Sequence, residues 1–216
     1  MENKIIKTIK QNACAELIEK KSRFIANIYI VENKEQAEGK IKEIKKKYYD
    51  AKHNCFAYSV LEDNQTIVKM SDDGEPSGTA GEPILNIILK NGLQNVLIIV
   101  TRYFGGILLG AGGLTRAYSN ASKQALANTE IEEKQLGVEV KLELNYSDSE
   151  KFKYFCNKNN IKINKIEYKE NIFYFIELTD EKLREILNEY SAKNEKKDIN
   201  IISCVELCRK YIKIVK

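Results

Sequence analysis

The sequence has few of the residues on which common kinds of functional site depend. The 216-residue chain contains no run of eighteen apolar residues, which excludes a transmembrane helix. Its N-terminus has neither a long apolar segment nor a cleavage-like site, so we expect no secretory signal and a cytoplasmic protein. The five cysteines form no C-x-x-C pair, and His53 stands alone, so we predict no metal and no cofactor.

Arginine and one-sided charge are also scarce. Lysine and arginine number 35 against 31 aspartates and glutamates, and a net charge of +4 is too small to indicate nucleic-acid binding by itself. Only five of these cations are arginines, and two of them, Arg102 and Arg116, lie in one glycine-rich stretch. In a chain that otherwise uses lysine, an arginine indicates a site that favours a planar bidentate donor.

Proline and glycine are concentrated in two stretches. Both prolines lie in SDDGEPSGTAGEPIL, residues 71–85, and five of the eleven glycines lie in VTRYFGGILLGAGGLTRAY, residues 100–118. A strand, a glycine-rich turn and a helix start together expose backbone N–H groups to an anion. The stretch matches neither the nucleotide P-loop nor the dinucleotide-binding glycine motif. The alternative is that these glycines serve only tight turns and close packing.

The predicted binding residues come from both stretches. We expect the arginines to flank an anion site and the hydroxyls to contribute to it, and we predict no catalytic residue. The full set is Asp72, Asp73, Glu75, Ser77, Thr79, Arg102, Tyr103, Gly105, Gly106, Gly110, Gly112, Gly113 and Arg116, with His53 from the strand before them.

Two alternatives for the chemistry stay open. Asp72, Asp73 and Glu75 form either an acid–base or metal cluster, or a set of turn caps and internal salt bridges to the arginines. His53 and Cys55 lie on one side of a strand, where a nucleophilic pair is conceivable. Parallel side chains without a third orienting group favour a histidine with satisfied hydrogen bonds instead.

The apolar patterns in the first part of the chain predict a mixture of strands and helices. Residues 33–49 have apolar positions at helical spacing, and we interpret their lysines at 40–47 as a solvated helix face, not a nucleic-acid face. Other predicted helices are 83–92 and 113–128. Predicted strands are 13–20, 22–31, 54–62, 65–71 and 95–104, with a hairpin turn at Asp63-Asn64.

A second domain follows a charged stretch without periodicity, 130–137, where we predict a hinge. The chain is thus expected to form two domains, 1–132 and 137–216. The second has strands at 137–146, 161–168, 172–179 and 199–215, and helices at 147–159 and 180–193. This βαββαβ order is typical of the ferredoxin-like arrangement, which indicates architecture and little about activity.

Four motifs carry a family resemblance. The chain resembles the YigZ/IMPACT family in its bacterial two-domain form. Residues 17–120 carry the resemblance, because four motifs occur there in the family's order: KKSRFIA, HNCFAY and the two stretches above. The resemblance implies an α+β fold. Its N-terminal α/β sandwich would be like the second domain of a small-subunit ribosomal protein, and its C-terminal domain like the fifth domain of elongation factor G.

The same resemblance implies a function in translation, because eukaryotic relatives regulate translation through the amino-acid-starvation kinase pathway. We therefore expect a non-enzymatic regulator that binds RNA or the ribosome, with no membrane association. A protein partner and the oligomeric state stay open. The alternative from another class is a metal-dependent hydrolase that uses Asp72, Asp73 and Glu75.

Overall fold

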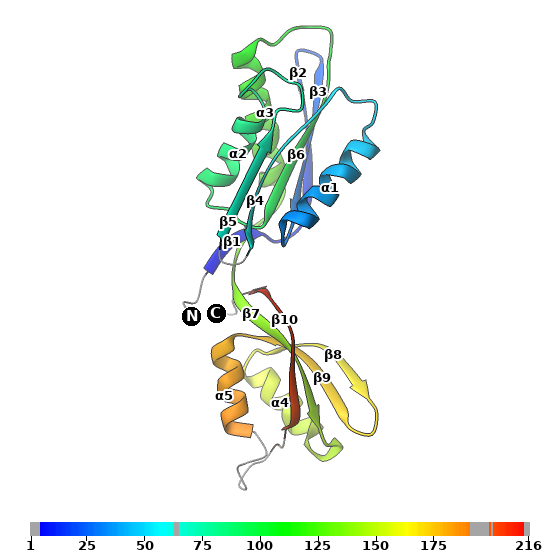
Figure 1. Cartoon of the computed structure of the whole chain (residues 1–216), viewed down its shortest axis with the longest axis vertical. Helices are drawn as coiled ribbons and strands as arrows, with labels where there is room; N and C mark the ends of the chain where they lie inside the picture. The colour runs from blue at the N-terminus through cyan, green and yellow to red at the C-terminus, as the bar shows by residue number, and fades with distance from the viewer. Residues whose placement is uncertain (1–4, 63–64, 191–198, 200, 214–216) are drawn as a thin grey trace. The chain divides into compact units, whose positions relative to one another are not determined.

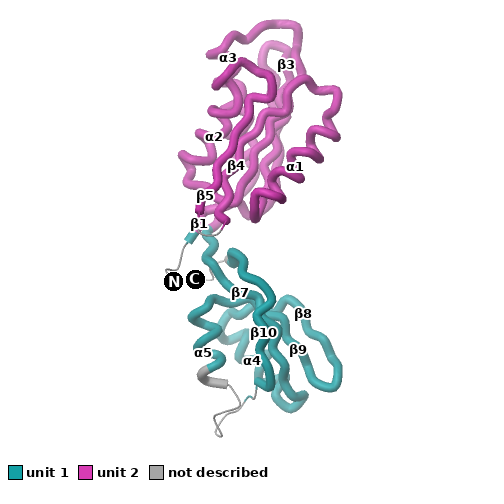
Figure 2. The backbone as a smooth tube through the Cα atoms, in the orientation of Figure 1, with its two compact units in different colours: residues 1–5, 133–216 teal, residues 6–132 magenta. Residues whose placement is uncertain are grey.

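The computed structural model describes residues 5–62, 65–190, 199 and 201–213 (Figure 1). The chain divides into two compact units, Ile6–Glu132 and Glu133–Lys216 together with Met1–Ile5 (Figure 2). Both units combine helices with antiparallel sheet, which confirms the predicted α+β class. None of the helices in the described ranges has the length and apolar composition that crossing a membrane requires.

Five antiparallel strands form the sheet of the first unit. Their order is β2-β3-β6-β4-β5. The apolar run of β6 explains its central place, since a strand covered on both faces needs apolar residues at almost every position. The strand bounds are β2 Ala13–Glu19, β3 Ser22–Ile30, β4 His53–Glu62, β5 Gln65–Ser71 and β6 Val96–Tyr103.

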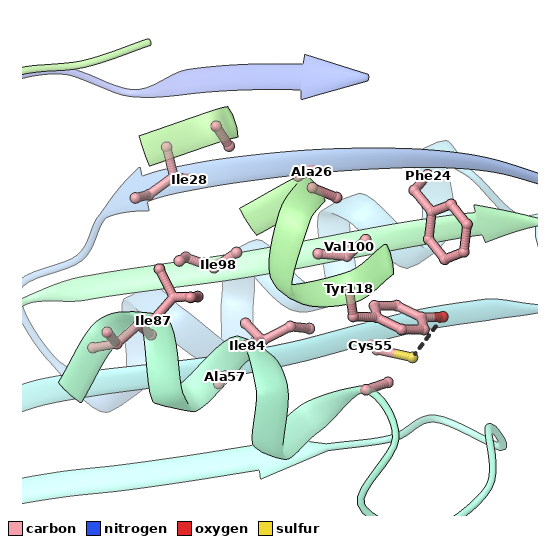
Figure 3. Packing of buried hydrophobic residues seen from close by; sticks show 14 of the residues in the cluster. Phe24, Ala26, Ile28, Cys55, Ala57, Ile84, Ile87, Ile98, Val100 and Tyr118 are labelled. Carbon is pink, nitrogen blue, oxygen red and sulfur yellow. Dashed lines mark hydrogen bonds between the residues drawn. The ribbon is translucent and has the colours of Figure 1, made fainter. Parts of the chain in front are cut away.

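Helices cover both faces of this sheet. Helices α2 (Gly81–Lys90) and α3 (Ala111–Ala127) pack on one face, and α1 (Lys34–Lys47) packs on the other. Because successive strand side chains point to opposite faces, Ile98 of β6 belongs to the α2/α3 core and Ile99 to the α1 core. Figure 3 shows part of the larger core, with side chains from β3, β4, β6, α2 and α3 in one layer.

The second unit has the predicted βαββαβ order. Strands β10, β7, β9 and β8 follow one another in its sheet, with each neighbouring pair antiparallel, and β1 (Ile5–Ile9) also pairs with β7 as the fifth strand. Helices α4 and α5 pack on one face, where Phe152, Cys156 and Ile186 contact the buried residues of the strands. The element bounds are β7 Ile131–Leu144, α4 Ser149–Lys158, β8 Lys162–Tyr168, β9 Ile172–Leu178, α5 Asp180–Tyr190 and β10 Ile201–Lys213.

Two segments differ from the sequence predictions. Strand β1 (Ile5–Ile9) was not predicted, although its Ile9 is fully buried in the α2/α3 core. The stretch 130–137, predicted to be an aperiodic hinge, belongs almost entirely to β7, which pairs with β10 from Lys134 onwards. Residues 131–136 are exposed or half-buried, so this part of the strand lacks the apolar alternation that identifies strands.

Some predicted features lie outside the described residues. They are the hairpin turn at Asp63-Asn64, the end of the helix predicted for 180–193 and the end of the strand predicted for 199–215.

Candidate functional site

The two rare-residue stretches meet at one end of the first unit's sheet. Arg102 lies near the end of β6, opposite Phe24 of β3 and His53 of β4 in the strand register. It therefore faces the side of the sheet that α2 and α3 cover. From there it reaches Glu75, in the loop between β5 and α2, and so joins the second stretch to the first.

Glu75 is the centre of a buried polar network. One oxygen, Oε1, accepts hydrogen bonds from Arg102 Nη1 at 2.6 Å and from the Tyr118 hydroxyl at 2.8 Å. The side chains of Arg102 and Glu75 are only 7% and 3% exposed, so both charges have left the solvent. Removing one partner of such a pair strongly destabilises the folded protein, because the other charge then stays buried without compensation.

Aromatic rings complete the surroundings of Arg102. Its guanidinium lies 5.5 Å from the ring centroid of Phe24 and 5.5 Å from that of Phe104. Its Nη2 lies 3.4 Å from Ser22 Oγ, while its Nε is buried without a hydrogen-bond partner among the described residues. The sequence predicted that Arg102 flanks an anion site, with an internal salt bridge to the acidic residues as the alternative. The structure shows the internal salt bridge.

Asp72 caps the N-terminus of helix α2, although it precedes the first helical residue, Gly81, by nine positions. Its Oδ1 accepts hydrogen bonds from the N–H groups of Ala80 and Gly81, and its Oδ2 accepts one from Gly78. Burial alone would raise the pKa of Asp72, but these three hydrogen bonds outweigh it and hold the pKa below the usual value. The helix begins at Gly81, whose missing Cβ lets it lie against the backbone of Ser71.

Asp73 anchors the same loop to the neighbouring strand and helix. Its carboxylate binds Lys45 Nζ at 2.5 Å and accepts a hydrogen bond from the N–H of Asn54 at 2.7 Å. The three acidic residues therefore serve three different sets of partners. Among the described residues, no group of three or more histidine, cysteine, aspartate or glutamate side chains is arranged to hold a metal ion.

His53 and Cys55 share one face of β4, as predicted, but each is hydrogen-bonded to the loop. His53 Nδ1 lies 2.8 Å from the Asp73 carbonyl oxygen, and Cys55 Sγ donates to the Asp72 carbonyl at 2.9 Å. Figure 3 shows the second contact of Cys55, to the hydroxyl of Tyr118. Burial raises the pKa of the Cys55 thiol to about 12, so its nucleophilic thiolate is disfavoured near neutral pH.

The other predicted polar residues divide between interior and surface. The Thr79 hydroxyl donates to the Pro76 carbonyl at 2.6 Å, which is a turn contact, whereas Ser77 is exposed. Tyr103 points to the α1 side of the sheet, where its hydroxyl donates to Asp50 at 2.8 Å. It therefore does not line the same surface as Arg102.

Glycines shape the segment Phe104–Gly110, which we call the 104–110 loop. A Cβ on Gly105 would overlap the backbone of Lys21, so only glycine allows this loop to approach the β2–β3 turn. Gly110 has φ +71° at the cap of α3, a backbone conformation that favours glycine. Gly106 lies in the loop, while Gly112 and Gly113 lie in the first turn of α3.

The loop exposes apolar side chains, and an exposed arginine reaches back over the first turn of the helix that follows, where its Nη1 lies near Gly112. Phe104 is 53% exposed, Ile107 42% and Leu108 82%. Arg116, on the second turn of α3, is exposed and has neither an ion pair nor a hydrogen bond among the residues that the structure describes. The set of binding residues predicted from the sequence did not include Phe104 or Leu108. The signal for them would have been apolar side chains between the glycines of a loop, a position where polar residues are usual.

Comparisons with known proteins agree with the motifs. A family model, the Impact N-terminal domain, matches residues 20–126. The IMPACT family member YvyE of Bacillus subtilis (strain 168) is 37% identical over 194 residues, which is 89% of this chain and 88% of that protein. The IMPACT family member YigZ of Escherichia coli (strain K12) is 38% identical over 128 residues, 59% of this chain and 63% of that protein.

A solved structure, described as the crystal structure of a hypothetical protein, aligns with a TM-score of 0.63 and 29% identity. The alignment covers 87% of this chain and 91% of that chain, so it includes both units. Together with the extent of the match to the Bacillus subtilis relative, these findings show that the chain belongs to the IMPACT family.

Proposed function

We propose that this protein is a non-enzymatic modulator of translation that binds ribosomal RNA through the 104–110 loop and Arg116. The family resemblance supports the connection to translation. The geometry of the first unit supports the binding surface, because an exposed apolar loop with a free arginine beside it combines a stacking element with a phosphate contact.

The observation that carries the proposal is how firmly an exposed loop is held. Phe104 and Leu108 are largely exposed, yet the base of their loop is held close to the β2–β3 turn at Gly105. Any residue larger than glycine at this position would overlap the Lys21 backbone. The neighbouring Arg102 fixes the end of β6 through its buried bond to Glu75. Phe104, Ile107 and Leu108 expose apolar side chains within five residues of one loop, and contiguous exposed apolar patches typically mark binding surfaces.

The two arginines have different roles in this proposal. Arg102 positions the loop from inside, whereas Arg116 is free to contact a phosphate. The first hydrogen bond of α3 runs from the Leu114 N–H to the Gly110 carbonyl, so the N–H groups of residues 111–113 have no acceptor within the helix. These donors and the positive end of the helix dipole favour an anion near Arg116.

The β2–β3 turn adds two cations beside the same loop. Lys20 and Lys21 have φ values of 45° and 64°, which residues other than glycine, asparagine and aspartate rarely adopt. Both are exposed, and the Lys21 backbone lies against Gly105. The turn therefore places two exposed lysines next to the base of the 104–110 loop, where they add positive charge for a phosphate backbone.

Co-sedimentation of the protein with purified ribosomes tests the proposal. Leu108→Asp should reduce the sedimented fraction several-fold without lowering the thermal unfolding temperature, because Leu108 is 82% exposed. Tyr154→Asp is the matched control, since Tyr154 is 71% exposed on α4 of the other unit and should leave co-sedimentation unchanged. Absence of co-sedimentation for the wild type, or equal behaviour of both variants, contradicts the proposal.

A further inference from the structure

The sheet face of the second unit that is opposite α4 and α5 carries two aromatic side chains. Along β9, Ile172, Tyr174, Ile176 and Leu178 are buried in the core that α4 and α5 cover. The alternate residues, Phe173 and Phe175, must then point to the opposite face, where they are half-buried. Two residues along a strand are about 6.7 Å apart, so the rings form a short row on one of the two inner strands.

Lysines on the neighbouring strands lie over these rings. In the register, Phe175 is opposite Lys141 of β7 and Lys165 of β8. Lys141 Nζ lies 4.1 Å from the ring centroid of Phe173 and 6.0 Å from that of Phe175. Lys165 lies 5.4 Å from the Phe175 ring, and Lys169 lies 5.7 Å from the Phe173 ring. On this face, therefore, the two aromatic rings lie among three lysine side chains.

The carboxylates on this face have partners within the fold. Lys210 Nζ binds Glu139 at 2.8 Å and Glu177 at 2.6 Å. Glu143 accepts hydrogen bonds from Ser203 and Asn171, and Glu167 pairs with Lys165 and Lys169.

Lys141 has no ion pair among the described residues, although it lies between both rings. Side-chain hydrogen bonds lower the pKa of the neighbouring Glu143 carboxylate and the charge of Lys141 helps to lower it further, but no described carboxylate holds Lys141 in a direct ion pair, so the ammonium group can contact a negatively charged ligand. The same face thus offers two flat apolar surfaces and one unpaired positive charge between them.

We propose that this face binds single-stranded RNA, with Phe173 and Phe175 stacking on two bases and Lys141 contacting the phosphate between them. Four-stranded sheets recognise single-stranded RNA by such stacking, and aromatic side chains accept any base because every base has a flat π face. The site lies on a different unit from the 104–110 loop, so it stands or falls independently of the proposed function.

A local reporter can detect this binding. The chain has no tryptophan, so Phe175→Trp introduces a single fluorophore at the proposed stacking position. We expect single-stranded oligouridine of about ten nucleotides to quench its fluorescence with a saturable titration, because a stacked base lies directly on the ring. RNA bound only at the first unit would leave this fluorescence unchanged.

Anisotropy of fluorescein-labelled oligouridine measures the contribution of each side chain. Removing one stacking ring, in Phe173→Ala or Phe175→Ala, should weaken binding at least about fivefold, and Phe175→Tyr should retain it. Lys141→Ala should weaken binding and flatten its salt dependence without touching the core. Tyr154→Ala removes an exposed aromatic ring from the helix side and should have no effect.

Two results would overturn the proposal. One is unchanged fluorescence of the folded Phe175→Trp protein at RNA concentrations that saturate the wild type. The other is self-association of the chain that RNA does not affect and that Phe173→Ala or Val205→Asp abolishes, which would assign the face to a second copy of the chain. Val205 of β10 is 52% exposed and lies opposite Lys141 in the register. Circular dichroism on each variant establishes that its fold is retained.

Discussion

The guanidinium of Arg102 and the carboxylate of Glu75 form an ion pair of 2.6 Å with both side chains out of solvent. Tyr118 donates to the same carboxylate oxygen from α3. The pair therefore links β6, the loop before α2, and α3, which are the three elements that hold the candidate surface.

Arg102→Ala should destabilise the protein by about 3–5 kcal/mol, because it leaves Glu75 buried without its cation. Urea denaturation followed by circular dichroism measures the loss. Lys10→Ala is the control, since the Lys10–Glu130 pair is exposed and solvent screens it, so removing it should change the stability far less than Arg102→Ala does. Equal effects of the two substitutions would show that the Arg102 pair is not structurally important.

Asp72→Asn should cost about 1–2 kcal/mol at neutral pH, since the amide cannot accept all three backbone hydrogen bonds at the start of α2. The folded-state pKa of Asp72 lies below its unfolded value, so its stabilisation is present above about pH 4 and is lost as the pH falls through the folded pKa.

The free-energy difference between wild type and Asp72→Asn should therefore shrink in acid. Denaturation curves at pH 7 and near pH 3 measure it. A difference that stays constant or grows as the pH falls would show that Asp72 is not held ionised by the helix.

Cys55 should resist alkylation in the folded protein. Burial raises its thiol pKa to about 12, and its Sγ is engaged by the Asp72 carbonyl and Tyr118. Cys14, which is exposed on β2, should react with iodoacetamide at neutral pH long before Cys55 does. Mass spectrometry of the labelled peptides checks the order, and rapid labelling of Cys55 would revive the nucleophile hypothesis.

Gly105→Ala should distort the 104–110 loop, because the added methyl group would overlap the Lys21 backbone. We expect a loss of more than about 1 kcal/mol, whereas Gly39→Ala in α1 should be neutral or stabilising by up to about 1 kcal/mol. Apart from its chain neighbours and the backbone of its own helix, no atom lies within 4 Å of a Cβ at Gly39, which makes it a matched control. Unfolding temperatures of both variants test this, and a harmless Gly105→Ala would remove the argument that the loop is held in place.

The sequence predicted most helices and strands of the first unit because their apolar patterns are strong. The run at 95–104 identified β6, and Pro83 placed α2 within two residues of its observed start. The capping of α2 by Asp72 was not predictable from the usual pattern, in which the cap directly precedes the helix. Only the folded loop brings Asp72 to the N–H groups of Gly78, Ala80 and Gly81.

The site was predictable as a region and not in its details. The scarcity of proline, glycine and arginine indicated both stretches, which do meet in space. Which arginine lies inside depends on the face of β6 that Arg102 occupies, and on Glu75 reaching it from another element. Tyr118 was not selected because a tyrosine within α3 has no signal that distinguishes a core residue from a member of a polar network.

The salt dependence of RNA binding by Arg116 variants tests the central claim most directly. The logarithm of the RNA-binding constant falls with the logarithm of salt concentration in proportion to the phosphate contacts made. Arg116→Ala should reduce that slope by roughly one and weaken all RNA sequences about equally, and Arg116→Lys should recover part of the affinity. Arg184→Ala, an exposed arginine on α5, should leave the slope unchanged. A slope that is the same for wild type and Arg116→Ala would contradict the account.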